Sequence, residues 1–200
     1  MIWLQIFQPL ALSLDRIDRE IYQQIVLYSD PVWLREICTF IVKTGNVFPV
    51  FFVFFAIYGS KKPRAAFILF VATLILLGLS ESVASALKDV FQRRRPVYQM
   101  GFFISDGGYS FPSAHALNTM AFAVFWASRF KSSAHWFYVF SIIIGFARML
   151  ANFHFPGDIL AGWVVGYFVG FFFAFLFNWL GKKYPPLNEV TEFGQATGAP

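Results

Sequence analysis

The sequence is dominated by long apolar segments separated by short charged loops, and a membrane-spanning helix needs about 20 such mainly apolar residues. Five segments fit this pattern, at residues 37–58, 65–87, 114–129, 135–153 and 158–180. Hydrophobic residues make up 58% of the chain and charged residues only 14%, whereas a soluble domain has about 45–50% and about 25%. We therefore expect an all-α fold, a polytopic membrane helix bundle with five transmembrane helices.

The N-terminal region follows a different pattern from the apolar segments. Aliphatic residues recur at helical spacing between charged and polar positions in residues 12–29: Leu14, Ile17, Ile21 and Ile25. This spacing is typical of an amphipathic helix that lies in the membrane interface. The chain is therefore expected to comprise an interfacial segment, residues 1–31, a membrane domain, residues 32–183, and a polar C-terminal tail, residues 184–200.

Basic residues indicate how the helices are oriented. The loop ends at residues 59–64, 129–131 and 182–183 hold seven Lys or Arg and no acid. With five spans these ends lie on one side, which the positive-inside rule makes cytoplasmic. The loops at residues 88–112 and 153–158 then face the outside. Because the basic residues flank membrane segments, the net charge of +5 does not indicate a nucleic-acid partner.

Three stretches on this outer face carry most of the chemically reactive residues. In the first, six residues separate Lys88 from Arg95, which Pro96 follows, and Arg93 and Arg94 lie between them. Four cations on the side where the positive-inside rule expects few indicate a binding role. The alternative is that they snorkel to the interface and contact anionic lipid.

The second stretch is Pro112-Ser113-Ala114-His115, where the chain turns and a new apolar segment begins. Ser113 is a favoured helix N-cap residue. The N–H groups of the first helical turn, at Ala114 and His115, would then bind an anion together with the helix dipole. The alternative is a structural cap beside a surface histidine.

The third stretch contains Arg148, then His154 after five residues, then Asp158 after three more. An arginine within a membrane helix is costly and usually functional. Asp158 can accept a hydrogen bond from His154 and fix its tautomer, either across one helical turn or across a turn at Pro156-Gly157. The alternative for this pair is a structural contact.

Together these groups suit phosphoryl transfer without a metal. Lys88, Arg95 and Arg148 would hold the phosphate oxygens, with the N–H groups of the Ser113-capped turn adding dipoles where negative charge develops. Arg93 and Arg94 are candidate contacts to a charged headgroup.

The two histidines of this face take different expected roles. Asp158 would orient the neutral imidazole of His154, which attacks phosphorus. His115, at the helix N-terminus and protonated, would donate a proton to the leaving oxygen. No cluster of metal ligands is apparent elsewhere in the sequence.

The three stretches resemble the signature of the type 2 phosphatidic acid phosphatase family, which shares its fold with vanadium haloperoxidases. That signature reads Lys-x6-Arg-Pro, Pro-Ser-Gly-His and Ser-Arg-x5-His-x3-Asp, and the first part is intact here. Ala114 replaces Gly in the second part and Ala147 replaces Ser in the third. Both replacements are small and remove no catalytic group. Order and spacing agree over residues 88–158, and the pattern of apolar segments extends the resemblance to residues 33–180.

The resemblance implies a membrane phosphatase domain with a phosphohistidine intermediate at His154, no metal or other cofactor, and a lipid phosphate monoester or diphosphate as substrate. It places the protein in the inner membrane of a bacterium, with the active site facing the periplasm or exterior. Undecaprenyl diphosphate, phosphatidic acid, phosphatidylglycerol phosphate and the phosphates of lipid A are all candidate substrates. The choice among them, five or six spans, and the oligomeric state remain open.

A non-enzymatic anion transporter is the alternative function. A transporter places its charged residues along a path near the membrane midplane, whereas here they cluster at one face beside two histidines and a carboxylate.

Glu81 lies two helical turns before Lys88 on the same helix face, so it either braces a site cation or is a buried structural acid. A further pattern of small residues four apart predicts close helix packing: Gly162, Gly166 and Gly170.

Overall fold

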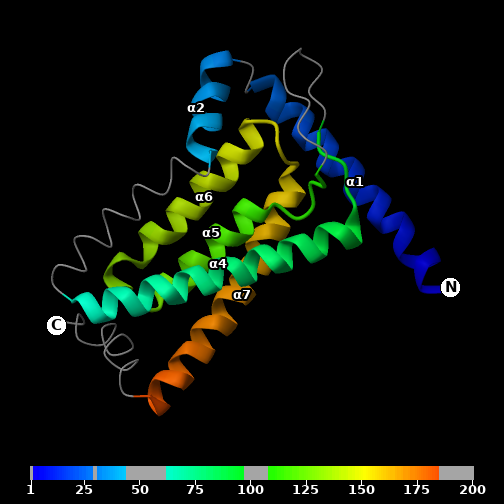
Figure 1. Ribbon diagram of the computed structural model, residues 1–200. Helices are drawn as coiled ribbons and strands as arrows, with labels where there is room; N and C mark the ends of the chain where they lie inside the picture. Colours follow the sequence, from blue (N-terminus) through cyan, green and yellow to red (C-terminus); the bar gives the residue numbers. More distant parts are fainter. Residues whose placement is uncertain (1, 29–30, 44–61, 97–107, 185–200) are drawn as a thin grey trace.

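The computed structural model describes residues 2–28, 31–43, 62–96 and 108–184, and these ranges are all-helical, with no strand (Figure 1). The prediction of an all-α fold is therefore confirmed. The helices are α1 (Ile2–Tyr28), α2 (Val32–Val42), α4 (Pro63–Phe91), α5 (Ala114–Ala127), α6 (Ala134–Leu150) and α7 (Pro156–Lys183), with a short 3-10 helix at Lys131–Ser133 before α6.

Among the residues that the structure describes, three helical segments are long and apolar enough to cross a membrane: α4, α7, and the 3-10 helix together with α6. They correspond to the predicted segments at 65–87, 158–180 and 135–153. The predicted segment at 114–129 forms α5, but its 14 residues extend only about 21 Å, which is less than the hydrocarbon thickness of about 30 Å. Residues 44–58 of the first predicted segment lie outside the described residues, so the count of five stays a prediction.

Helix α5 lies at the centre of the bundle and packs against α4, α6 and α7. Its contact with α7 is close because α7 presents glycines to it. A Cβ on Gly162 would lie 2.7 Å from the carbonyl oxygen of Ser113, and a Cβ on Gly166 would collide with the backbone of Leu117. The predicted small-residue packing is thus found, and it fixes the start of α5 against the start of α7.

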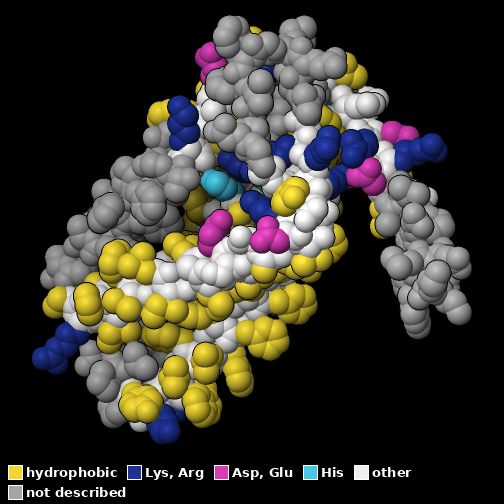
Figure 2. Space-filling model, turned by 45° about the vertical axis from the view of Figure 1, so that its right-hand side comes forward, with side chains coloured by type: hydrophobic (Ala, Val, Ile, Leu, Met, Phe, Trp, Pro, Cys, Tyr) yellow, Lys and Arg dark blue, Asp and Glu magenta, His cyan; other side chains and the backbone are white. Residues whose placement is uncertain are grey.

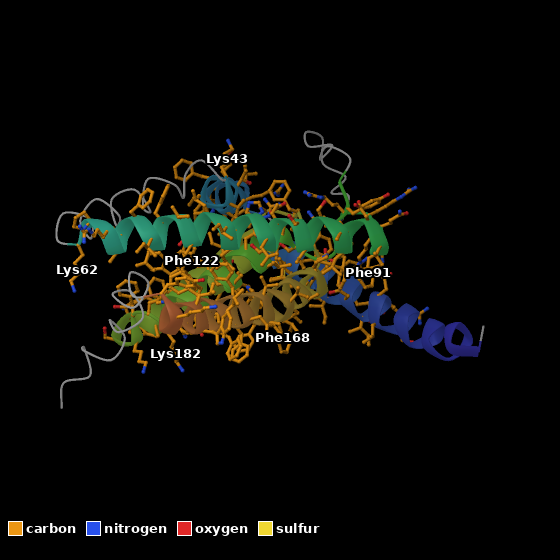
Figure 3. All side chains as sticks on the ribbon, turned by 60° about the horizontal axis from the view of Figure 1, so that its bottom comes forward. Lys43, Lys62, Phe91, Phe122, Phe168 and Lys182 are labelled. Carbon is orange, nitrogen blue, oxygen red and sulfur yellow. The ribbon has the colours of Figure 1, made fainter. Side chains whose placement is uncertain are left out.

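The outer faces of the long helices are apolar. Figure 2 shows a broad band of hydrophobic side chains over the lower part of the molecule, with the acidic and histidine side chains and many of the basic ones gathered above it. Large exposed residues on α4 and α7 contribute to such faces: Phe67, Leu74, Ile75, Phe168, Phe172 and Phe175. In Figure 3, Lys62 and Lys182 lie toward one end of the bundle and Phe91 toward the other, and Phe168 points outward. These faces suit contact with lipid.

Helix α1 is the predicted amphipathic segment, and it begins earlier than residue 12, at Ile2. It crosses the start of α7 rather than joining the bundle (Figure 1). Tyr22 is buried there, its ring lies edge-on to Phe155 at 5.0 Å between centroids, and its hydroxyl donates to Asn152 Oδ1 at 3.1 Å. The N-terminal helix is thus held against the turn between α6 and α7.

Candidate active site

The first predicted stretch lies at the end of α4. Lys88 is in the last turn of the helix, and its carbonyl accepts the N–H of Gln92, whose left-handed backbone (φ 48°) ends the helix. The chain then runs back without regular structure through Arg93 to Pro96. The Ser110 N–H donates to the Arg93 carbonyl at 2.7 Å. This bond joins the first stretch to the residues just before the second.

The second stretch forms the start of α5, and Ser113 is its N-cap, as predicted. The Ser113 hydroxyl accepts the N–H of Ala116 at 3.5 Å, a long capping bond. The Ser113 N–H donates to the carbonyl of Asp158 at 3.0 Å, which joins the second stretch to the third. Ala114 and His115 occupy the first turn, where helix geometry leaves N–H groups without an intrahelical acceptor.

The third stretch connects α6 to α7 and reverses the chain direction. Arg148 lies in the last turn of α6, and a turn through Asn152, whose φ is 61°, brings His154 back to it. One terminal nitrogen of Arg148 lies 3.4 Å from His154 Nε2. Asp158 lies in the first turn of α7, where its Oδ2 accepts the N–H of Phe155 at 2.9 Å. His154 and Asp158 therefore meet across a turn and a helix start.

His154 and Asp158 form a buried pair, with exposed fractions of 1% and 0%. His154 Nδ1 lies 3.5 Å from Asp158 Oδ2, longer than an ordinary hydrogen bond, as catalytic contacts often are before substrate binds. If Nδ1 carries the proton, Nε2 presents its lone pair toward Arg148. Burial lowers the pKa of His154 to about 4, and the hydrogen bond to Asp158 only partly offsets it. The imidazole is therefore neutral at pH 7.

The three predicted phosphate-binding cations gather around the histidines. Lys88, Arg95 and Arg148 all lie within electrostatic range of His115, as does His154. The Nε atoms of Arg95 and Arg148 are buried and have no hydrogen-bond acceptor among the described residues. Burial also lowers the pKa of Arg95. Buried Nε–H groups without an acceptor favour binding of an anion at this point.

Arg93 has a different environment from the other cations. Its NH1 nitrogen lies 2.7 Å from Asp158 Oδ1 and 2.7 Å from Asp18 Oδ2, and its NH2 nitrogen lies 2.7 Å from Asp15 Oδ1. Burial alone lowers the pKa of Arg93, but the charge of Asp158 and the bond to Asp18 outweigh it, and the pKa is raised. Its predicted headgroup contact is therefore not supported by this geometry, whereas Arg94 is exposed and its headgroup contact stays a prediction.

Two carboxylates of α1 belong to this region, although sequence patterns did not select them. Asp15 and Asp18 stand on the polar face of the predicted amphipathic helix, where acids are expected to face water. The signal that could have identified them is their three-residue spacing, which places both on one helix face. The cations at residues 88–95 need acidic partners of this kind. Glu81 does not contact Lys88 directly: it is exposed, and its Oε2 accepts the side-chain N–H of Asn118 at 2.6 Å.

Comparisons with known proteins bear on the family and the fold of the chain. The model of a family described as the PAP2 superfamily matches residues 65–182. A lipid A 4'-phosphatase of Bacteroides thetaiotaomicron is 35% identical over 63 residues, which is 30% of this chain and only 27% of that protein. Two solved structures are similar in fold at low sequence identity. One, a transmembrane PAP2 type phosphatidylglycerolphosphate phosphatase from Bacillus subtilis, has a TM-score of 0.64, 20% identity, and coverage of 86% of this chain and 87% of that one. The other, Aquifex aeolicus LpxE, has a TM-score of 0.57, 19% identity, and coverage of 77% and 92%.

Proposed function

The chain belongs to the PAP2 superfamily, and on that premise we propose that it is an integral membrane phosphatase that hydrolyses a lipid phosphate monoester or diphosphate without a metal. One observation carries the proposal most directly. The buried imidazole of His154 is held between two oppositely charged groups, with Nε2 3.4 Å from Arg148 and Nδ1 3.5 Å from Asp158. This arrangement suits a neutral nucleophile aimed at an anionic substrate.

Substrate binding rests on the three cations and the start of α5. Lys88, Arg95 and Arg148 would donate hydrogen bonds to the phosphate oxygens, and the arginine forks favour bidentate contacts. The first-turn N–H groups at Ala114 and His115 would bind the same oxygens, and α5 directs its positive dipole end there. The buried Nε atoms of Arg95 and Arg148 would thereby obtain acceptors.

The chemistry then has two steps. His154 Nε2 attacks phosphorus, an N–P bond forms, and the bond to the leaving oxygen breaks while His115 donates a proton to that oxygen. Burial and the neighbouring cations lower the pKa of His115 to about 3, so the negative charge of the bound phosphate is what would keep this ring protonated. In the second step, a water molecule attacks the phosphohistidine, His115 takes the proton from the water, and the N–P bond breaks. The products are the dephosphorylated lipid, or the lipid monophosphate from a diphosphate, and inorganic phosphate.

Asp158 supports both steps by accepting a hydrogen bond from Nδ1, which stabilises the positive charge on the ring while it carries the phosphoryl group. In the described part of the chain, no group of three His, Cys, Asp or Glu side chains gathers as a metal site would require. We propose that residues 32–183 form the phosphatase domain, that residues 1–31 form an interfacial segment, and that residues 184–200 form a tail. The active site is proposed to face the periplasm or exterior of a bacterial inner membrane.

The substrate class follows from relatives rather than from the site. A similar protein is described as a lipid A 4'-phosphatase and a similar fold as a phosphatidylglycerolphosphate phosphatase, so these two lipids are the first candidates. Undecaprenyl diphosphate and phosphatidic acid complete the panel.

The test is release of inorganic phosphate from each of these lipids by the purified protein in detergent with EDTA present. We expect release from at least one lipid, inhibition by vanadate, and loss of release in His154→Gln. His135→Gln, at an exposed histidine at the start of α6, is the matched control and should keep full activity. No release from any of the four lipids, or release only with an added divalent cation, would contradict the proposal.

A further inference from the structure

The N-terminal helix α1 reaches the active site through two carboxylates. Asp15 and Asp18 are one helical turn apart, and each lies 2.7 Å from a terminal nitrogen of Arg93. Arg93 in turn donates to Asp158 Oδ1 at 2.7 Å. Asp158 is the residue that faces His154 Nδ1. A continuous chain of charged contacts therefore runs from α1 to the proposed nucleophile.

Asp18 makes a second contact that bears on the same point. Its Oδ1 accepts the backbone N–H of Gly157 at 2.7 Å. Gly157 lies in the first turn of α7, where helix geometry leaves N–H groups without partners, and the N-cap of α7 is Phe155, whose side chain has no acceptor. Asp18 therefore supplies from α1 the acceptor oxygen that a Ser or Asp cap would normally supply locally, and the helix dipole favours its negative charge there.

The glycine at position 157 fits this contact closely. A Cβ at Gly157 would lie 2.8 Å from Asp18 Oδ2, so any other residue would push the carboxylate away. The ring of Phe155 is also covered by two guanidinium groups, with Arg93 at 4.2 Å and Arg19 at 5.2 Å from the ring centroid. Arg19 also bonds to Asp15 at 2.7 Å. The turn that carries Asp158 is thus held from outside the bundle by α1.

We propose that Asp18 and Arg93 are positioning residues, through which helix α1 fixes the carboxylate of Asp158 against His154. One oxygen of Asp158 is bound by Arg93 and the other by the Phe155 N–H, so the carboxylate plane has little freedom to rotate. Without Arg93 or Asp18, the carboxylate turns away from Nδ1, and the nucleophile loses its orientation while the phosphate-binding cations stay in place. Only the kinetic test of this positioning role depends on the proposed phosphatase function.

The first experiment needs no turnover. We expect the proton on His154 Nδ1, which faces Asp158, to give a deshielded NMR resonance that is absent in His154→Gln. The chain has only three histidines, which makes the assignment feasible. We expect Asp18→Ala and Arg93→Gln to weaken or abolish this resonance. Glu20→Gln, which removes an exposed charge from the same helix, is the matched control and should leave it unchanged.

The second experiment separates positioning from binding, with para-nitrophenyl phosphate as the probe. We expect Asp18→Ala and Arg93→Gln to lower kcat by about tenfold or more, as loss of an orienting partner does, with KM changed by less than twofold. Asp18→Glu and Arg93→Lys should recover part of kcat. The double variant Asp18→Ala/Arg93→Gln should lose less than the product of the two single losses, because the two residues act partly through the contact between them.

Gly157→Ala tests the same contact without removing a charge, since its Cβ displaces Asp18. It should lower kcat as Asp18→Ala does. Gly78→Ala, where a Cβ meets nothing within 4 Å, is its control. The proposal is overturned if the resonance and kcat of the Asp18 and Arg93 variants match those of Glu20→Gln, or if KM rises while kcat holds. If the wild-type chain hydrolyses no phosphate and the resonance responds as expected, the proposed function fails and the positioning role stands.

Discussion

His154 and Asp158 are only four residues apart, yet they meet across the junction of two elements, with Nδ1 3.5 Å from Oδ2. His154 lies before α7 begins, and Asp158 lies in its first turn. The pair is fully buried, and Arg148, from the end of α6, faces the opposite nitrogen of the ring.

The pH dependence of phosphoenzyme formation should reflect a nucleophile that resists protonation. Burial lowers the pKa of His154 to about 4, while Asp158 opposes the shift and Arg148 and Arg95 add to it. Only the neutral ring can attack, so the rate should hold as pH falls from 7 to 5 and drop as pH passes through about 4. Single-turnover rates with para-nitrophenyl phosphate measure this, because its leaving group needs no proton. An acid limb near 6.5, the ordinary histidine value, would argue against a buried nucleophile.

The role of His115 should depend on the leaving group. An alkoxide needs a proton as it leaves and an activated phenolate does not, so His115→Ala should slow hydrolysis of an alkyl phosphate by about 10²- to 10⁴-fold. The same variant should still form phosphoenzyme from para-nitrophenyl phosphate at a measurable rate. Comparing the two substrates on one protein preparation removes any effect of folding. Equal losses on both would assign His115 to phosphate binding rather than to proton transfer.

Replacing Arg95 or Arg148 by Lys should weaken phosphate binding although the charge is kept. The lysine cannot reproduce the bidentate contact of a guanidinium group, and charge-assisted hydrogen bonds contribute about 1.5–3 kcal/mol each. We expect kcat/KM to fall by about 10- to 100-fold. The matched control is Lys131→Met, an exposed cation before α6. Activity within twofold of wild type in both arginine variants would exclude them from the phosphate site.

The close contact of α5 with α7 should make Gly166 intolerant of a side chain. A Cβ there collides with the backbone of Leu117, whereas one on Gly78 meets nothing within 4 Å. Overpacking a tight interface costs about 1–3 kcal/mol, so Gly166→Ala should lower the thermal unfolding temperature in detergent, and Gly78→Ala should not. Equal unfolding temperatures for the two variants would show that α5 and α7 are further apart than described.

The orientation in the membrane can be tested with single cysteines in a Cys38→Ala background. Gln24 on α1 and Ser132 in the 3-10 helix are both exposed and are proposed to face opposite sides, because the positive-inside rule puts the basic ends in the cytoplasm. An impermeant thiol reagent added to intact cells should label Gln24→Cys and leave Ser132→Cys unlabelled until the cells are lysed. The reverse pattern would place the active site in the cytoplasm.

The clustering of site residues was predictable because the membrane leaves few alternatives. Charged residues within and next to apolar segments are energetically costly, so they usually have a function. The spacings of Lys88 to Arg95 and of Arg148 through His154 to Asp158 identified one face. The N-cap at Ser113 was predictable from local chemistry alone.

Other features depend on which elements pack together, and no local pattern encodes them. Arg93 and Arg94 lie beyond the signature residues, which suggests a headgroup contact for both, but Asp15, 78 residues from Arg93, binds it. Arg129 is one of the seven basic residues that predict the cytoplasmic side, yet it is only 2% exposed and its guanidinium lies against Phe125 and Phe177. The role of α1 at the site could not be read from its amphipathic pattern, which fits a helix on lipid equally well.

The most direct test of the account is whether phosphate passes through His154. Rapid quench with a phosphorus-labelled lipid phosphate should trap a phosphoryl-protein in the wild-type chain that is labile in acid and stable in base, as a phosphohistidine is. The label should be absent in His154→Gln and unaffected in His135→Gln. A label that persists in His154→Gln, or that appears on another residue, would contradict the central claim that His154 is the nucleophile.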